Sequence, residues 1–353
     1  MAHVGELFGQ LVKAVPPGAP PAAWIQRWCP FTSKVCDVSA NRGDRAFLDL
    51  GHRSVTEGER QLIKELYGDK PIPLGICTVA TKRRFEQTTK PWIICPKRVL
   101  ELRTSPPVIP EVVRDLIPIQ KETPVRCWWE FKFAANGVED EEEAAGPGGR
   151  FFEFTFDYIL IPVEPRGESK QPRLIGPPFI IEVMTSSTRG GGLTEHMVDV
   201  LALRGQRSLR GVVDSPYTPN YRQVFGRMAS QLYAKSEVAE AWGGRTIWVL
   251  QDVLAEYIEQ TTAFKAQDFD GKQQGNVFAV VYRLEESTDG YDLVYDKTLR
   301  GMARATGERQ PDFTSMLGAG YVPPVEMLYE TLASTQERRR KPSDHVNWID
   351  FRW

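Results

Sequence analysis

The chain has 353 residues, 41% of them apolar and 10% aromatic, enough for one large domain or two smaller ones with a sizeable core. It contains no run of about 18 apolar residues and no N-terminal signal pattern, which argues against membrane insertion and secretion. Five cysteines, an odd number, argue against a disulfide framework, so we expect a protein of the reducing cytoplasm.

The formal net charge of −2 is unusual for a nucleic-acid-binding protein, but five of the acidic residues lie in the single run 139–143. Basic residues gather in short clusters at 82–84, 97–98, 204–210 and 338–341. Such clusters usually form solvated surface, so they permit DNA binding without establishing it.

The N-terminal region begins with residues 1–25, which end in a Pro- and Ala-rich stretch and predict a leader followed by an extended spacer. Farther along, Thr56 and Glu59 have the spacing of a capping box, and apolar residues follow at helical intervals. This pattern predicts a helix over 56–66.

Two predicted strands, 72–79 and 92–96, each carry a cysteine, and two more cysteines precede the helix. Thiolates are ligands of zinc and iron, and four of them form a closed, tetrahedral structural site. Four separately buried thiols are the alternative, because the spacing lacks a short Cys-x2-Cys knuckle and free Cys packs as a small apolar group. The candidate metal ligands are Cys29, Cys36, Cys77 and Cys95, whereas we assign Cys127 to the buried-thiol class.

A shift in composition near residue 106 predicts a boundary between an N-terminal domain, 1–105, and a second domain, 106–353. Soon after the boundary, residues 126–133 have the pattern of a strand and carry Glu130 beside two tryptophans.

Two apolar strands predicted at 152–160 and 178–184 each contain one carboxylate, Asp157 and Glu182. A carboxylate in such a strand is costly unless it is paired, hydrogen-bonded or bound to a metal. Magnesium takes one or two carboxylates together with substrate phosphate oxygens, so the pair predicts a shared Mg²⁺ site. The alternative is that both carboxylates lie at strand edges and face water.

Helices and strands alternate through the rest of the chain, which predicts an α/β fold with a mixed sheet flanked by helices. The predicted helices are 193–203, 221–238, 252–260 and 325–335, the predicted strands are 246–250, 277–284 and 291–295, and a mobile tail is expected after the last helix.

The helix 221–238 has one apolar face, and its polar residues are spread over the rest of its surface. Arg and Gln side chains at such positions are usually only solvated, although they are also suited to phosphates and base edges. The candidate DNA contacts are Arg222, Arg227 and Gln231, and Lys235 is placed on the same polar surface.

Several short segments, taken in order, resemble the NotI-type restriction endonucleases. The segments are Cys29-Pro30-Phe31, Cys36, Gly75-Ile76-Cys77-Thr78-Val79, Ile94-Cys95-Pro96-Lys97-Arg98, Phe154-Thr155-Phe156-Asp157-Tyr158, Phe179-Ile180-Ile181-Glu182-Val183-Met184-Thr185 and Pro219-Asn220-Tyr221. The resemblance implies a homodimeric type II enzyme that cuts double-stranded DNA at a long, GC-rich palindrome. It also implies a PD-(D/E)xK nuclease core and a four-cysteine iron site, for which zinc is the alternative.

The same resemblance assigns the catalytic metal to Asp157 and Glu182, with Glu130 assisting from an upstream strand. Met184 stands at the third catalytic position, where this family has Gln and the broader nuclease pattern has Lys. A thioether can neither donate a hydrogen bond nor carry a charge, so any water-orienting role of that Gln is either missing here or taken by another group. Two alternatives remain open at this stage, a DNA-binding protein with a decayed nuclease core and a structure-specific repair nuclease.

Overall fold

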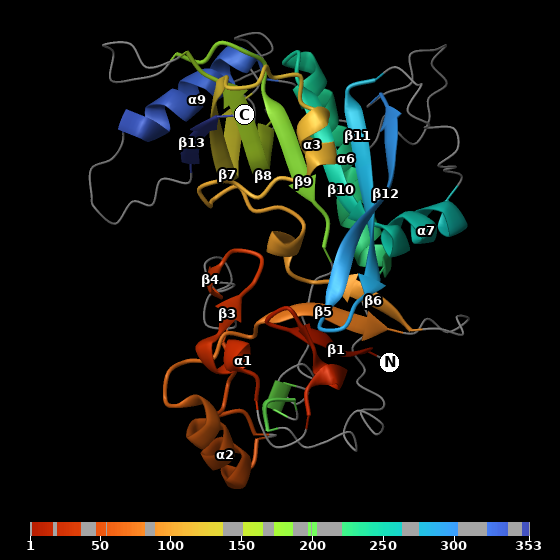
Figure 1. Ribbon diagram of the computed structural model, residues 1–353. Helices are drawn as coiled ribbons and strands as arrows, with labels where there is room; N and C mark the ends of the chain where they lie inside the picture. Colours follow the sequence, from red (N-terminus) through yellow and green to blue (C-terminus); the bar gives the residue numbers. More distant parts are fainter. Residues whose placement is uncertain are drawn as a thin grey trace.

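The computed structural model describes most of the chain in separate stretches. These are residues 2–16, 20–36, 47–53, 55–81, 89–136, 151–164, 173–185, 197–198, 200–202, 221–262, 275–302, 323–337 and 348–352. Within them the chain builds a seven-stranded sheet, a four-stranded sheet below it in Figure 1, and a short hairpin.

The smaller sheet is antiparallel and has the strand order β2-β1-β5-β6. Its strands are β1 (Ala2–Leu7), β2 (Gln10–Leu11), β5 (Ile76–Thr81) and β6 (Lys90–Ile93). The prediction of a leader at the N-terminus was therefore wrong. Because β1 pairs with β5 over most of its length and buries Val4 and Leu7, it is a central strand of this sheet.

Beside this sheet lie the hairpin β3 (Trp28–Cys29) and β4 (Lys34–Val35), α1 (Ala22–Gln26), α2 (Glu57–Tyr67) and the 3₁₀ turns η1 (Val12–Ala14) and η4 (Pro96–Arg98). The capping box predicted for α2 is present, since Thr56 Oγ1 accepts the Glu59 N–H at 3.3 Å and the Glu59 carboxylate accepts the Thr56 N–H. Capping of this kind satisfies donors that the first turn of a helix leaves unpaired.

The larger sheet has the order β12-β11-β10-β9-β8-β7-β13. Its strands are β7 (Pro124–Asn136), β8 (Phe151–Pro162), β9 (Phe179–Val183), β10 (Arg245–Gln251), β11 (Val277–Glu286), β12 (Tyr291–Gly301) and β13 (Trp348–Arg352). The pairs β9/β10 and β10/β11 are parallel, whereas the other neighbours are antiparallel. The predicted mixed sheet is thus confirmed.

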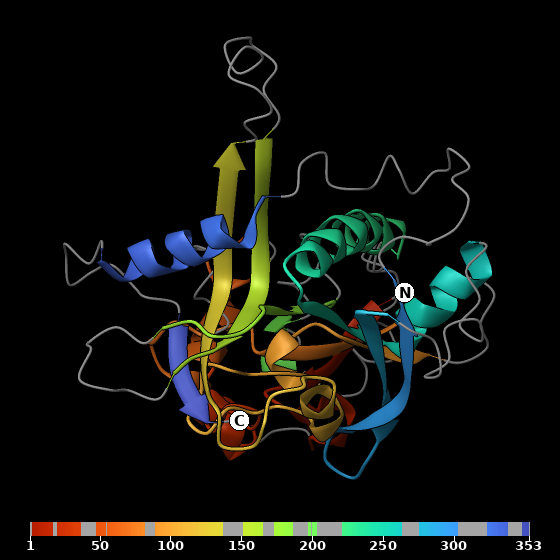
Figure 2. The ribbon, with the colours of Figure 1, turned by 90° about the horizontal axis from the view of Figure 1, so that it is seen from above.

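Helices cover both faces of the larger sheet, as the predicted α/β fold requires (Figure 2). On one face, α6 (Tyr221–Ala241) and α9 (Val325–Glu337) pack over phenylalanines of β7 and β8. On the other face, α3 (Glu111–Asp115) and the segment before it bury Val113, Leu100 and Leu102. A further helix, α7 (Asp252–Thr261), follows β10 directly.

A mobile tail was predicted after the last helix, and for Trp348–Arg352 that prediction was wrong. Residues Trp348–Arg352 form β13, which pairs antiparallel with the outer edge of β7. A five-residue strand has a weak pattern of its own, and the open edge of a neighbouring strand supplies the hydrogen bonds that order it. The predicted helix 193–203 lies mostly outside the described residues.

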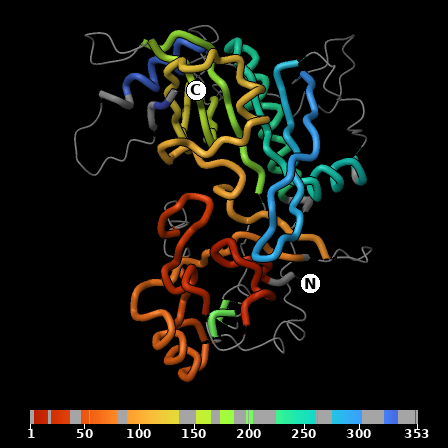
Figure 3. The backbone as a smooth tube through the Cα atoms, viewed as in Figure 1, coloured from red at the N-terminus to blue at the C-terminus, as the bar shows by residue number. Residues whose placement is uncertain are grey.

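A hairpin formed by β11 and β12 joins the two sheets, because its tip reaches the smaller sheet (Figure 3). The Leu11 N–H donates to the Asp289 carbonyl at 2.8 Å, and the Tyr291 N–H donates to Glu6 Oε1 at 2.7 Å. Arg98 forms an ion pair with Glu6 and also donates to the Tyr291 carbonyl. This arrangement buries Arg98, so the assignment of 97–98 to a surface basic cluster was wrong.

No helix in the described stretches is long and apolar enough to cross a membrane.

Candidate active site

Asp157 and Glu182 meet where the pairing of β8 with β9 ends. The last backbone pair is Tyr158 with Ile181, and the next position on each strand holds one of the two acids. Asp157 Oδ2 accepts the Val183 N–H at 2.9 Å, and Glu182 Oε1 accepts the Asp157 N–H at 3.3 Å. Each carboxylate therefore accepts a backbone N–H that would bond to the neighbouring strand if the pairing of β8 with β9 continued. These two hydrogen bonds hold the side chains close together.

Glu130 lies opposite Asp157 across the neighbouring strand pair. The register of β7 and β8 pairs Trp129 with Tyr158 and Phe131 with Phe156, so Glu130 and Asp157 occupy the opposing positions between these pairs. Glu130 has a φ of 50°, in the left-handed region that residues with a Cβ seldom adopt. Backbone strain of this kind is concentrated at functional sites. The structure thus brings all three predicted carboxylates to adjacent positions on β7, β8 and β9.

On β7 and β8, the alternation between residues that pack on the α3 side and on the α6 side of the sheet is shifted at Glu130 and Asp157. Trp129 packs with the core on the α3 side of the sheet, whereas Phe131, two residues later, packs on the α6 side. On β8, Phe156 packs on the α6 side and Tyr158 on the α3 side. Residues two apart in a regular strand share a face, so the strands are distorted at the acidic pair.

The electrostatics of the three carboxylates oppose their joint ionisation. Burial, and next the charge of Asp157, raises the pKa of Glu182 to about 8, although Lys235 acts in the opposite direction. Burial also raises the pKa of Asp157 against the effects of Lys235 and Arg227. Burial raises the pKa of Glu130, while Arg103 acts in the opposite direction and Asp157 adds to the increase. Like charges directly across a strand pair are unfavourable, and a bound cation would relieve them.

Lys235, on α6, contacts this site directly. Its Nζ atom lies 2.6 Å from Glu182 Oε2 and 2.6 Å from the Thr155 carbonyl oxygen, and 5.4 Å from the centre of the Phe156 ring. Its side chain is only 2% exposed. A lysine is almost never buried to this extent without a partner, and here a carboxylate, a carbonyl and an aromatic ring share its charge.

The sequence pattern predicted Lys235 on the polar surface of its helix, and that prediction was wrong because the side chain is buried. Lys235 follows Leu232 by three positions and Met228 by seven, so it continues the apolar stripe that packs toward the sheet. The spacing was therefore the available signal, because a lysine in a buried stripe requires a buried anion.

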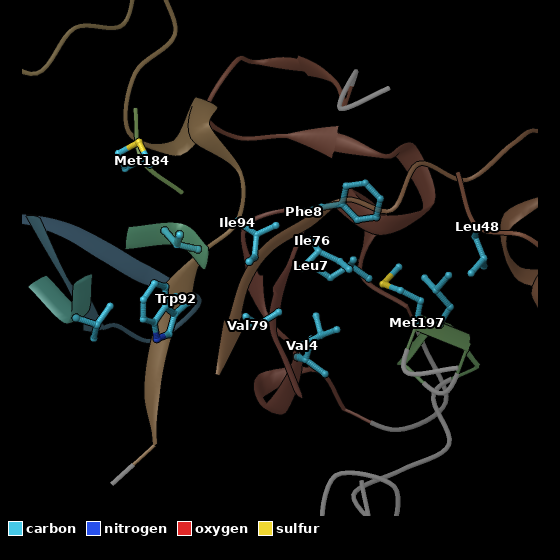
Figure 4. Close-up of a cluster of buried hydrophobic side chains, with 14 of the residues drawn as sticks. Val4, Leu7, Phe8, Leu48, Ile76, Val79, Trp92, Ile94, Met184 and Met197 are labelled. Carbon is cyan, nitrogen blue, oxygen red and sulfur yellow. The ribbon is translucent and has the colours of Figure 1, made fainter. Parts of the chain in front are cut away.

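Met184 lies beyond the end of β9, where its N–H donates to the Val249 carbonyl at 2.9 Å. Its side chain is buried in the large apolar cluster that also contains Met197, Val224 and Trp248. Figure 4 shows part of this cluster, with Met184 at one edge and Leu48 at the opposite edge. The thioether therefore acts as a packing group at the position predicted to be catalytic.

The predicted DNA contacts lie on the same helix as Lys235. Gln231 is partly buried one turn before it, and Arg227 is exposed two turns before it, near enough to lower the pKa of Asp157. The side chain of Arg222 is outside the described residues, as are the acidic run 139–143 and the basic clusters 82–84, 204–210 and 338–341.

The four cysteines predicted to bind metal are neighbours in the fold. Burial, and next the charges of Cys29 and Cys36, raises the pKa of the Cys95 thiol to about 12. Burial, and next the charge of Cys95, raises the pKa of Cys77. The Gly9 N–H donates to Cys77 Sγ at 3.2 Å, and the N–H groups of η4 donate to Cys95. Amide donors around buried sulfurs are typical of thiolate metal sites. The donor set therefore fits a four-thiolate iron or zinc.

The side chains do not by themselves form a coordination sphere. In the part of the chain that the structure describes, no group of three or more His, Cys, Asp and Glu residues converges closely enough to hold a metal ion. The four thiols thus lie near one another without forming a closed metal site, and the same holds for the three carboxylates of the larger sheet. Cys127 is buried in the larger sheet, as predicted for a packing thiol.

Neither the models of known protein families nor the curated proteins that were compared with this chain match it. The resemblance to NotI-type endonucleases therefore rests on the short sequence segments.

Proposed function

We propose that the protein is a Mg²⁺-dependent endonuclease that cuts double-stranded DNA at a specific, palindromic and GC-rich site. The observation that carries the proposal is the placement of Glu130, Asp157 and Glu182 at adjacent positions on three neighbouring strands. Two carboxylates on neighbouring strand ends, joined by substrate phosphate oxygens, provide the oxygen ligands that Mg²⁺ prefers.

Asp157 and Glu182 would hold the metal, and Glu130 lies next to Asp157 on the neighbouring strand β7. When bound, Mg²⁺ supplies Lewis-acid stabilisation of the phosphate charge and lowers the pKa of a coordinated water. The residues around it keep the carboxylates in place, because the N–H groups of Val183 and Asp157 anchor one oxygen of each.

The reaction is hydrolysis of one phosphodiester bond in each strand. A water oxygen forms a new bond to phosphorus, and the bond from phosphorus to the leaving sugar oxygen breaks. One water proton is released to solvent, and the leaving oxygen takes a proton from solvent. No oxidant or other co-reactant is needed.

A palindromic site suits a protein that acts as a homodimer, since the same surface of each copy then meets one half-site. Arginine contacts to guanine in the major groove are the usual way to read G·C pairs. Exposed Arg227 and partly buried Gln231 lead from the helix surface toward the carboxylates, which supports placing the DNA along α6.

The decisive experiment incubates the purified protein with plasmid DNA and Mg²⁺. Discrete fragments are expected, and they would reveal the recognition site by sequencing of their ends. Intact DNA would favour a DNA-binding protein with a decayed nuclease core, and smearing or nicking at branched structures would favour a repair nuclease.

We also propose that Cys29, Cys36, Cys77 and Cys95 hold a structural iron or zinc. Elemental analysis should find about one iron or zinc per chain, and Cys95→Ala should lower both the metal content and the melting temperature, since a structural site converts metal affinity into folding free energy. Cys127→Ala is the matched control, because it removes a buried thiol outside the cluster and should keep the metal. Protein that lacks iron and zinc and melts as the wild type does would contradict the site.

Arg227 is expected to contact a DNA phosphate. Arg227→Ala should weaken binding to all sequences alike and should make the slope of log affinity against log salt shallower by about 0.9, the contribution of one neutralised phosphate. Gel-shift titrations at several salt concentrations measure both quantities. Arg114→Ala is the control, because Arg114 is exposed on α3 at the opposite face of the sheet. An unchanged slope for Arg227→Ala would make this residue ordinary solvated surface.

A further inference from the structure

We propose that Lys235 is the catalytic cation of this nuclease and replaces the group that Met184 cannot supply. The inference rests on the proposed function and assigns the third catalytic role to α6 instead of β9. During hydrolysis, the Lys235 ammonium donates a hydrogen bond to a non-bridging oxygen of the scissile phosphate, where negative charge builds up.

The first argument is the position of Lys235 relative to Glu182. Glu182 Oε1 is occupied by the Asp157 N–H, and its Oε2 lies 2.6 Å from Lys235 Nζ. Asp157 and Glu182 are the residues that would hold the metal, and Lys235 Nζ contacts one of these two carboxylates. The ammonium would therefore be available to a phosphate bound at the same carboxylates.

The second argument is that the position of the ammonium does not depend on Glu182. The Thr155 carbonyl accepts one N–H at 2.6 Å, and the Phe156 ring lies 5.4 Å from Nζ. Both groups belong to β8, so they hold the ammonium when the charge of Glu182 is shared with a metal. An ammonium has three N–H donors, and the bonds to Thr155 and Glu182 use two of them.

The third argument is that Met184 is unsuitable for this role while Lys235 is suitable. The Met184 side chain is buried in an apolar cluster and carries neither charge nor donor. A buried ion pair brings little net stability, because desolvation offsets much of the attraction. A charge retained at such a position is better explained by the chemistry that it performs.

The reading to be excluded is that Lys235 only neutralises Glu182 in the metal-free protein. In that case Lys235→Met would cleave DNA at the wild-type rate once Mg²⁺ is saturating, because the metal itself then neutralises Glu182. A catalytic Lys235 predicts instead that the loss persists at every Mg²⁺ concentration.

The test compares Lys235→Met with wild type in single-turnover cleavage at saturating Mg²⁺. The rate should fall about 10²–10³-fold, the cost of removing one preorganised donor to a developing charge. Calorimetry of the metal alone should show Mg²⁺ affinity that is not weakened, and DNA binding with Ca²⁺ should match wild type. Lys132→Met is the matched control, because Lys132 pairs with Glu153 on the exposed surface of β7 and β8.

Lys235→Gln provides a second variant if Lys235→Met has a much lower melting temperature than the wild type. Gln keeps a donor for the Thr155 carbonyl but has no charge, so it should show the same loss of rate. Cleavage at the wild-type rate by either variant would overturn the catalytic role of Lys235, as would a loss of rate that disappears when the Mg²⁺ concentration is raised. Either result would leave the proposed nuclease function intact. A wild-type protein that leaves plasmid DNA intact with Mg²⁺ would instead overturn the nuclease function and this inference with it.

Discussion

Asp157→Asn is expected to abolish DNA cleavage while the protein stays folded and still binds its DNA site. The change removes one negative charge from the metal site, and the lost metal-supplied stabilisation amounts to several kcal/mol of the activation barrier. Because each step of about 1.4 kcal/mol is a factor of ten, the cleavage rate should fall at least about 10³-fold.

Asparagine suits this test because its amide oxygen can still accept the Val183 N–H that Asp157 Oδ2 accepts at 2.9 Å. Cleavage is measured with Mg²⁺ and binding with Ca²⁺, and the melting temperature is recorded beside them. Glu153→Gln is the control, since Glu153 lies on the same strand with its side chain exposed. Cleavage by Asp157→Asn at the wild-type rate would remove Asp157 from the active site.

Glu6→Ala is expected to have the largest effect on stability. Glu6 is fully buried, accepts the Tyr291 N–H, and forms an ion pair with Arg98, whose side chain is 2% exposed. Removing one partner of a buried pair leaves an uncompensated charge, which costs about 3–5 kcal/mol of unfolding free energy. Denaturant unfolding measures this loss.

A second ion pair at the same junction offers a matched comparison. Lys13, on η1 beside the smaller sheet, pairs with Glu286 of the β11–β12 hairpin, but their side chains are 58% and 49% exposed. Lys13→Ala should therefore change the unfolding free energy by only about 0–1 kcal/mol. Equal effects of Glu6→Ala and Lys13→Ala would show that burial of the Arg98 pair does not stabilise the junction.

Local sequence patterns were sufficient for most of the secondary structure. The alternation of phenylalanines with polar residues in 152–156 predicts a strand, and β8 is formed there. The capping box of α2 is equally local, because its partners are three residues apart. Patterns that involve only neighbouring residues survive in the folded chain.

The acidic residues of the site also follow from the sequence, whereas their arrangement does not. A carboxylate in a buried strand is conspicuous wherever it occurs, so Asp157 and Glu182 could be chosen without a structure. Their exchange of backbone donors depends on the antiparallel pairing of β8 with β9, and the position of Glu130 depends on the register of β7. Register is a property of the sheet, and a short motif does not contain it.

The sequence by itself thus determined the central strands of the larger sheet, the principal helices and the carboxylates of the candidate site, because each depends on residues that are close in the chain. Only the tertiary structure decided that β1 and β13 are sheet strands, that Arg98 is buried, and that Lys235 reaches Glu182. These contacts join residues far apart in the chain, and their free energy comes from desolvation and pairing that exist only after the elements have packed.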